Sequence, residues 1–178
     1  MALRPIVRYP HPALLTPTKL VERVTPEVRA LVDDMWETMY DAPGVGLAAN
    51  QIAVDLRVAI IDTRSSQEPG QKKLVLINPV ILETGGRQSE EEGCLSFPGF
   101  TEPVTRPEWV RVRALDLDGN EYEAEGTGLL ARAFIHETDH LDGRPFIERM
   151  SLLKRDLIRR RIRKQMKTGT WVTVPDGQ

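Results

Sequence analysis

Apolar residues recur at helical spacing soon after the start of the chain. Thr25, Pro26 and Glu27 form a typical helix start, because they supply a hydroxyl cap, a proline for the first turn and an acid near the positive end of the helix dipole. The pattern continues through Val28, Leu31, Val32, Met35 and Met39. We therefore predict an N-terminal helix that ends at Pro43-Gly44.

Two further helices are predicted near the C-terminus. Thr127 could cap a helix that runs through Leu141 and ends at Asp142-Gly143. Ser151 could cap a last helix, with one narrow apolar stripe made of Leu153, Leu157, Ile158, Ile162 and Met166.

The segments between the first and second helices are rich in β-branched or alternating residues and predict strands. The predicted strands are Arg57 to Ile61, Leu74 to Ile77, Val80 to Glu83, Trp109 to Leu117 and Tyr122 to Glu125. Asp118-Gly119 is a hairpin signal between the last two. An order of helix, strands, helix and helix indicates an α+β fold with antiparallel strands rather than alternating β-α-β units.

Composition limits the class of protein. The chain has 178 residues, of which 40% are hydrophobic and 28% charged, which suits one domain with a real core. We place this domain at residues 1–168 and a C-terminal tail at 169–178. A net charge of −2 argues against a general nucleic-acid binder, although residues 154–167 hold eight Lys or Arg and one acid. One cysteine, no leader-like apolar run and no stretch of about 20 apolar residues favour a cytoplasmic protein without a membrane span.

The run His136-Glu137-Thr138-Asp139-His140 carries the strongest chemical signal. Residues four apart share one face of a helix, so both imidazoles can reach one metal ion. Glu137 lies next to them and can accept a proton from a water at the metal. A chance arrangement is the alternative, but two of the three histidines in the chain fall in this run. The run predicts a metal-dependent hydrolase.

A third protein ligand is expected, since catalytic sites of this kind usually have three. His11 lies between two prolines and is better explained as a surface or packing residue. Cys94 is the better candidate, although a lone cysteine can also be a small buried apolar residue. A cysteine nucleophile with a histidine base is another reading, but it leaves Glu137 and the histidine pair unexplained.

Three segments together resemble the peptide deformylase family. They are Gly44-Val45-Gly46-Leu47-Ala48-Ala49-Asn50-Gln51, Glu92-Gly93-Cys94-Leu95-Ser96, and His136-Glu137-Thr138-Asp139-His140-Leu141-Asp142-Gly143. The resemblance runs from about Ile6 to Lys167. It implies an enzyme that removes the formyl group from the N-formylmethionine of new polypeptides and releases formate. It also implies antiparallel strands packed around a central metal-binding helix.

The resemblance extends to the site residues. It implies a metal held by Cys94, His136 and His140, usually Fe(II), with Zn, Ni or Co as substitutes. Glu137 would be the base, and the Gln51 amide and the Leu95 N–H would hold the oxyanion. Many members have glutamine before the first histidine, where this chain has Ile135.

The substrate is expected to lie extended between the glycine loop and the Cys94 segment. Gly46 and Gly93 would let a peptide approach the backbone and pair like an added strand. An apolar pocket for the methionine side chain is predicted near Val45, Leu129 and Ala133.

Two further interactions are predicted. Glu92 and Arg106 form an ion pair that fixes the Cys94 segment, unless both are simply solvated charges. The basic helix from Lys154 to Lys167 either completes the core with a solvated outer face or docks on ribosomal RNA.

Two other functions compete with deformylation. A related metallopeptidase would be revealed by activity on unformylated peptides. A metal-binding homologue without catalysis would have no chemical need to keep Glu137, Gln51, Cys94 and both histidines together.

Overall fold

Three α-helices and seven strands make up the regular structure of residues 2–176, the part of the chain that this computed structural model describes. The helices are α1 (Pro26–Asp41), α2 (Gly128–Leu141) and α3 (Leu152–Lys167), and short 3-10 turns lie at η1 (Pro12–Leu15), η2 (Ala49–Ile52) and η3 (Phe146–Arg149). The strands are β1 (Gly46–Ala48), β2 (Val58–Asp62), β3 (Lys73–Gly85), β4 (Gln88–Gly93), β5 (Thr101–Arg106), β6 (Trp109–Leu115) and β7 (Glu121–Thr127). Every strand pairing is antiparallel, so the predicted α+β class is confirmed.

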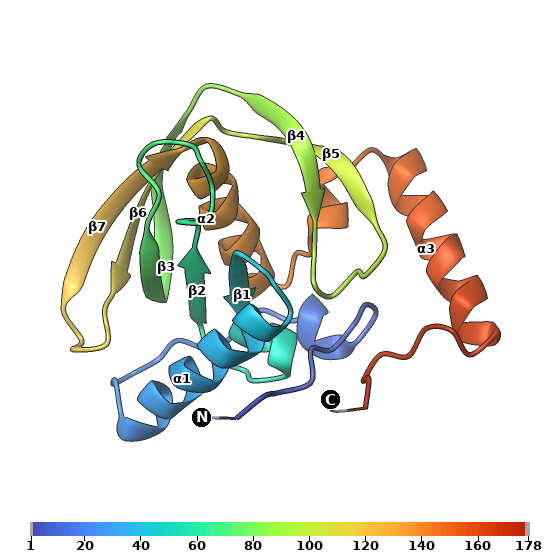
Figure 1. The fold of residues 1–178 in the computed structure, drawn as a ribbon, viewed down its shortest axis with the longest axis horizontal. Helices are drawn as coiled ribbons and strands as arrows, with labels where there is room; N and C mark the ends of the chain where they lie inside the picture. Colours follow the sequence, from blue (N-terminus) through green and yellow to red (C-terminus); the bar gives the residue numbers. More distant parts are fainter. Residues whose placement is uncertain (1, 177–178) are drawn as a thin grey trace.

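The strands form two sheets that enclose α2. Five strands pair in the order β1-β2-β3-β6-β7, while β4 and β5 form a separate ribbon. The ribbon arches from the far end of the large sheet toward α3, and α2 lies between the sheet and this arch (Figure 1). β1 is an edge strand with one unpaired side, and β4 pairs only with β5.

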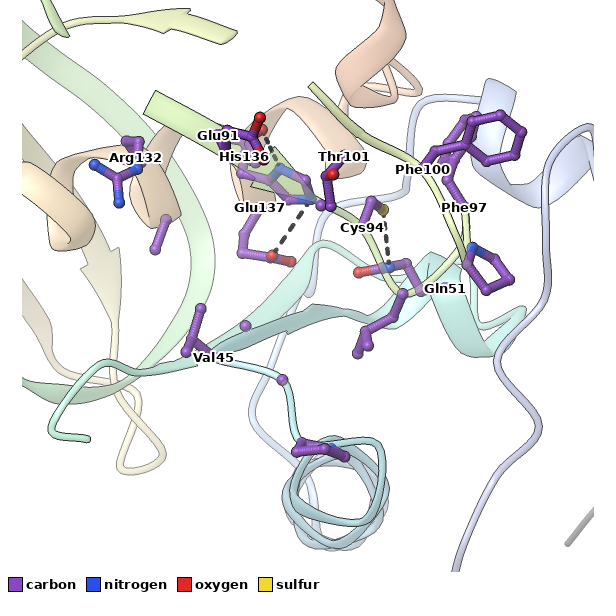
Figure 2. A pocket seen from close by; sticks show the side chains of 18 of the residues that line it. Val45, Gln51, Glu91, Cys94, Phe97, Phe100, Thr101, Arg132, His136 and Glu137 are labelled. Atoms are coloured by element: carbon purple, nitrogen blue, oxygen red, sulfur yellow. Dashed lines mark hydrogen bonds and ion pairs between the residues drawn. The ribbon is translucent and has the colours of Figure 1, made fainter. Parts of the chain in front are cut away.

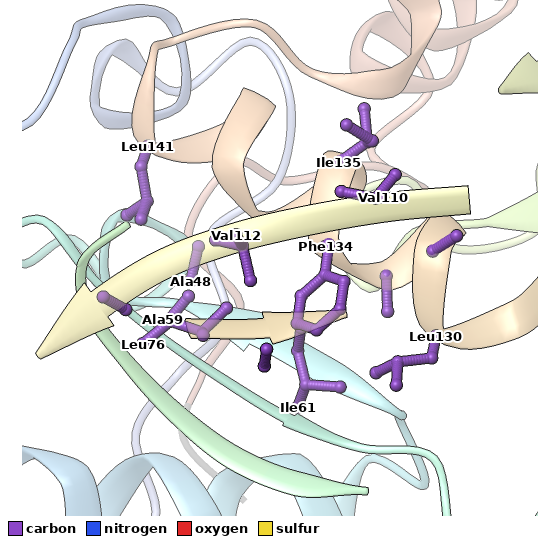
Figure 3. Close-up of a cluster of buried hydrophobic side chains, with 14 residues drawn as sticks. Ala48, Ala59, Ile61, Leu76, Val110, Val112, Leu130, Phe134, Ile135 and Leu141 are labelled. Carbon is purple, nitrogen blue, oxygen red and sulfur yellow. The ribbon is translucent and has the colours of Figure 1, made fainter. Parts of the chain in front are cut away.

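The large sheet is covered on both faces because β2 alternates its side chains between two cores. Ala59 and Ile61 belong to a cluster with Phe134 and Leu130 of α2, shown in Figure 3. Val58 and Ile60 belong to a second cluster with the apolar face of α1. The period of two along a strand therefore holds the N-terminal helix and the histidine-bearing helix on opposite faces of one sheet.

The helix starts follow capping chemistry, with one correction. Thr25 caps α1 by accepting from the Val28 N–H at 3.3 Å, as predicted. Thr127 occupies the N-cap position of α2, as predicted, but its side chain makes no capping bond. Glu68 supplies one instead, from the loop between β2 and β3: its carboxylate accepts from the Leu129 N–H at 2.9 Å.

The strand predictions need three corrections, the first of which is that Gly46–Ala48, expected as part of a glycine loop, forms the strand β1. The segments Leu74 to Ile77 and Val80 to Glu83 belong to the single strand β3, with a register shift between Ile77 and Val80. Asn78 adopts a φ of 52° at this shift and pairs through its side-chain amide with both backbone groups of Val21, each at 2.8 Å. β4 and β5 were not predicted, because acidic residues in β4 hide the alternation expected of a strand.

The predicted apolar stripe of the last helix is only partly correct. Ile158 and Ile162 are buried, but Leu153 is 70% exposed and Leu157 and Met166 are also exposed. The helix touches the rest of the molecule along a narrow line, so its outer face carries both apolar and basic residues.

The predicted tail begins with an anchored residue rather than a loose one. Trp171 is buried, and its indole N–H donates to the Tyr9 carbonyl at 2.7 Å. Residues 177 and 178 of the predicted tail lie outside the described part of the chain. The boundary at residue 168 stays a prediction. None of the helices in the described residues has the length and apolar character that crossing a membrane requires.

Paired alanine substitutions on α3 test which face is buried. Ile162→Ala is expected to lower the free energy of unfolding by about 2–5 kcal/mol, because it leaves a cavity in the cluster with Trp171. Leu153→Ala is expected to change it by less than about 0.5 kcal/mol. Urea unfolding followed by tryptophan fluorescence measures both, and equal losses would contradict the assigned face.

Candidate active site

Three metal-ligand side chains converge at the C-terminal half of α2. His136 and His140 lie one helical turn apart, and Cys94 directly follows β4. The two Nε2 atoms are 3.1 Å apart, and the Cys94 Sγ lies 3.2 Å from the His140 Nε2. One ligand atom from each residue falls within 4.8 Å of the other two. The structure thus brings the three predicted ligands to one point.

The donor set fits a divalent cation. A thiol and two imidazoles are the ligands that Zn²⁺ and related transition metals use. The His136 Nδ1 faces the Glu92 carboxylate at 2.8 Å, which leaves its Nε2 directed at the cluster. Burial lowers the pKa of His140 well below its ordinary value, so its ring is neutral, as a ligand requires. Burial also opposes a charge on His136, but hydrogen bonds with Cys94 and Glu92 raise its pKa, so this point of the site stabilises positive charge.

A buried ionic network supports His136 from behind. The Arg106 side chain has no exposed surface and donates to Glu92 at 2.6 Å and to Asp139 at 3.0 Å. Arg149 of η3 donates to the same Asp139 through two nitrogens, at 2.8 and 2.9 Å. Burial alone would raise the pKa of Glu92, but the bonds from His136 and Arg106 hold it at about 2. The predicted Glu92–Arg106 pair is therefore present, largely buried, and joined to His136.

Glu137 lies beside the ligand cluster and is almost completely buried. Its Oε1 is 4.0 Å from the His136 Nε2, and its Oε2 has no hydrogen-bond partner among the described residues. Gly46 makes this placement possible, because a Cβ there would stand 2.7 Å from the Glu137 Oε1. Burial raises the pKa of Glu137 to about 7. The carboxyl group is thus held where it can exchange a proton with a molecule in the site.

Gln51 and Leu95 lie on the other side of the cluster. The Gln51 Oε1 accepts from the Ala48 N–H at 3.0 Å, which turns its Nε2 toward the Cys94 Sγ at 3.8 Å and the Ser96 Oγ at 3.2 Å. The Leu95 N–H donates to no backbone or side-chain acceptor within residues 2–176. The Gln51 Nε2 thus faces the region next to Cys94.

A cavity of about 390 Å³ opens onto these groups. It lies between the loop after α1, the Cys94 segment and α2, with Val45 and Arg132 at the end beyond Glu137 (Figure 2). The residues predicted to contact substrate all line it: Val45, Gly46, Gly93, Leu129 and Ala133. The geometry is that of a hydrolytic site with a side-chain pocket attached.

Comparison with known proteins agrees with this arrangement. The family model described as polypeptide deformylase matches residues 3–156. The peptide deformylase of Acidobacterium capsulatum is 54% identical over 171 residues, which cover 96% of this chain and 100% of that protein.

The chain belongs to the polypeptide deformylase family.

Solved structures of the family share the fold. The peptide deformylase of Legionella pneumophila aligns with a TM-score of 0.85 and 41% identity, over 96% of this chain and 99% of that one. A peptide deformylase of Ehrlichia chaffeensis in complex with actinonin aligns with a TM-score of 0.86 and 36% identity, over 93% of this chain and 98% of that one. The deformylase family removes the N-formyl group from new polypeptides and depends on a metal, so this chain is a hydrolase.

Several residues of this deformylase site were not identified from the sequence. Ser96 bonds Gln51, Arg149 bonds Asp139, and Arg132 lines the pocket. Helical spacing could have found Arg132, because it precedes His136 by four residues on the same face. Nothing local marks Arg149, since its partner is set by how η3 packs on α2.

Two residues discussed from the sequence lie outside the ligand cluster. Ile135 belongs to the core between α2 and the large sheet, so it faces away from the ligands. His11 is half-buried, and its Nδ1 accepts from the Ala13 N–H at 3.1 Å, in agreement with a packing role.

Removal of the central arginine tests the network. Arg106→Met is expected to lower the free energy of unfolding by about 3–5 kcal/mol, because it leaves two buried carboxylates without their shared cation. Arg113→Met, which removes an exposed pair with Glu121, is the matched control and should cost less than about 1 kcal/mol. Urea unfolding measures both, and a neutral Arg106 variant would show that the network does not stabilise the fold.

Proposed function

We propose that Cys94, His136 and His140 hold one divalent metal ion and that α2 is the central metal-binding helix of the deformylase. The convergence of one thiol and two imidazole nitrogens within 4.8 Å carries this proposal. When bound, the ion supplies Lewis acidity toward water and toward the formyl carbonyl. Fe(II) is the expected ion, with Zn, Ni or Co as substitutes, since this donor set suits all of them.

The substrate is the formylmethionyl end of a new polypeptide. The free edge of β1 and the Gly93 segment line opposite sides of the cavity, so an extended peptide can pair between them. Val45, Gly46 and Gly93 then contact the main chain, and Val45, Leu129 and Ala133 surround the methionine side chain. Since such chains leave the ribosome in the cytoplasm, we expect the enzyme to act there.

Glu137 moves the proton in this reaction. Its partnerless Oε2 accepts a proton from the attacking water, whose oxygen bonds to the formyl carbon. The Gln51 Nε2–H and the Leu95 N–H hold the oxygen that becomes negative, each worth roughly 2.7–4 kcal/mol in the transition state. Glu137 then gives the proton to the amine, the C–N bond breaks, and formate and a free N-terminus leave.

Formate release from a formyl-Met peptide tests the function and the role of Glu137. Glu137→Gln is expected to keep the metal and lose about 10²–10⁴-fold in kcat, because the shape is kept while the proton acceptor is lost. A near wild-type rate would remove Glu137 from the role of base.

Metal analysis tests the ligand set. Cys94→Ala should lose bound metal after dialysis, because a thiolate ligand is removed. His11→Ala should keep the metal, because His11 is the N-cap residue of η1 and not one of the three proposed ligands. Full occupancy in the Cys94 variant would exclude the thiolate ligand. Anaerobic purification with metal content and activity measured together distinguishes iron from its substitutes.

We also propose that α3 contacts ribosomal RNA. Its outer face carries Arg160, Arg163, Lys164 and Lys167, which line one shallow hollow, and such clustered cations favour phosphate. Converting these four residues to glutamine is expected to abolish salt-sensitive co-sedimentation with ribosomes, while formate release from a free peptide stays unchanged. Unchanged co-sedimentation would mean that the outer face of α3 is only solvated and that the helix serves to complete the core around Trp171.

A further inference from the structure

The pocket assigned to the methionine side chain has one cationic group. Its near walls are apolar and come from Val45, Leu129 and Ala133. Arg132 is the only arginine or lysine among the described residues that line the cavity. An apolar substrate side chain has no use for this group. The methylene stem of an arginine can pack against hydrocarbon, but its charged guanidinium needs a polar partner or water.

Arg132 is bonded on one side only. Its Nη1 donates to the Gln88 Oε1 at 2.6 Å, and Gln88 is in turn fixed by donating to the carbonyls of Pro107 and Gly128, each at 2.9 Å. A guanidinium has five N–H donors, and no carboxylate of residues 2–176 lies within 4.0 Å of this one. Donors therefore remain for an acceptor that enters the pocket.

The position of Arg132 matches the end of a bound side chain. It precedes His136 by four residues on α2, which places it about 6 Å along the helix from the ligand cluster. Figure 2 shows Arg132 and Val45 at the end of the cavity beyond Glu137, away from Cys94. A side chain that enters from the metal end therefore has its last atoms nearest to the guanidinium.

The lining carboxylates decide what charge that acceptor can have. Glu91, Glu92 and Glu137 all line the cavity. Arg106 already pairs with Glu92, so Glu91 and Glu137 are the lining carboxylates left to repel an anionic side chain, whereas a neutral oxygen acceptor keeps the hydrogen bond without that repulsion. Methionine sulfoxide has the length of methionine and carries one polar oxygen on its sulfur.

We propose that this enzyme also deformylates peptides that begin with formyl-methionine sulfoxide, with Arg132 donating to the sulfoxide oxygen. The proposal rests on the proposed function, because it assigns the first side chain to this pocket. The chemistry is the same hydrolysis: water adds to the formyl carbon, the C–N bond breaks, and formate leaves. The sulfur keeps its oxidation state throughout.

Three peptides that differ only in the first residue test the inference. Formyl-methionine, formyl-norleucine and formyl-methionine sulfoxide peptides are assayed for formate release by the metal-loaded wild type, Arg132→Met and Arg132→Lys. The wild type should process the sulfoxide with a kcat/KM within about tenfold of methionine, since the acceptor finds a charged donor. Arg132→Met should lower the kcat/KM for the sulfoxide peptide, relative to that for the methionine peptide, by about tenfold or more. The loss should appear mainly in KM, because the hydrogen bond from Arg132 to the sulfoxide oxygen forms already in the bound substrate.

The formyl-norleucine peptide is the control for each protein. Its kcat/KM relative to that of the methionine peptide should be the same in all three proteins, because neither side chain carries the sulfoxide oxygen. Arg132→Lys should restore part of the kcat/KM for the sulfoxide peptide relative to methionine. A sulfoxide ratio that is equal in the wild type and Arg132→Met overturns the inference while deformylation of formyl-methionine stands. A wild type that releases no formate from formyl-methionine would instead overturn the proposed function itself.

Discussion

The buried guanidinium of Arg106 holds together parts of the chain that are distant in sequence. It leaves the end of β5, meets Glu92 on β4 and reaches Asp139 on α2, with no exposed surface of its own. Because a buried charge is tolerated only when it is paired, each of these three elements fixes the position of the other two. His136 takes its orientation from Glu92, so the geometry of the cluster of Cys94, His136 and His140 depends on the Arg106 cation that holds Glu92 in place.

α2 connects this network with the core. One face of the helix packs on the large sheet through Phe134, Leu130 and Ile135, and the other carries the two histidines, Glu137 and Arg132. The ribbon of β4 and β5 closes over the polar face and brings Cys94 to it. The site therefore forms between two sheets that do not pair with each other, and the helix is the element they share.

Local signals in the sequence were enough for the positions of the helices and for the two histidines and Glu137 on α2, whereas Cys94 was predicted as the third ligand only through the resemblance to the deformylase family. A capping threonine, helical spacing and the His-Glu-x-x-His run depend only on neighbouring residues, so α1 and the chemistry of α2 could be recognised. The fold class followed from element order.

β4 was missed because its side chains are mostly acidic and exposed on a ribbon that has no core of its own, so no hydrophobic alternation marks it. The stripe on α3 was overestimated, because periodicity shows which residues share a face but not how wide the contact will be. Glu68 acts across 61 residues, and Arg149 joins η3 to α2 although it is only ten residues from Asp139, so only the folded chain reveals their partners.

Residues near both ends of the sequence pack together in a third cluster, which contains Phe97, Phe100, Ile158, Ile162 and Trp171. The Trp171 indole bonds to the carbonyl of Tyr9, and the Arg8 N–H donates to the Thr173 carbonyl at 2.7 Å. Phe97 and Phe100, which follow Cys94, belong to the same cluster. The wall of the active site beside Cys94 is therefore packed by residues that lie near both ends of the sequence. Loosening the chain around Trp171 would free the backbone beside Cys94 as well, so a segment far from the chemistry in the sequence sets how firmly that wall is held.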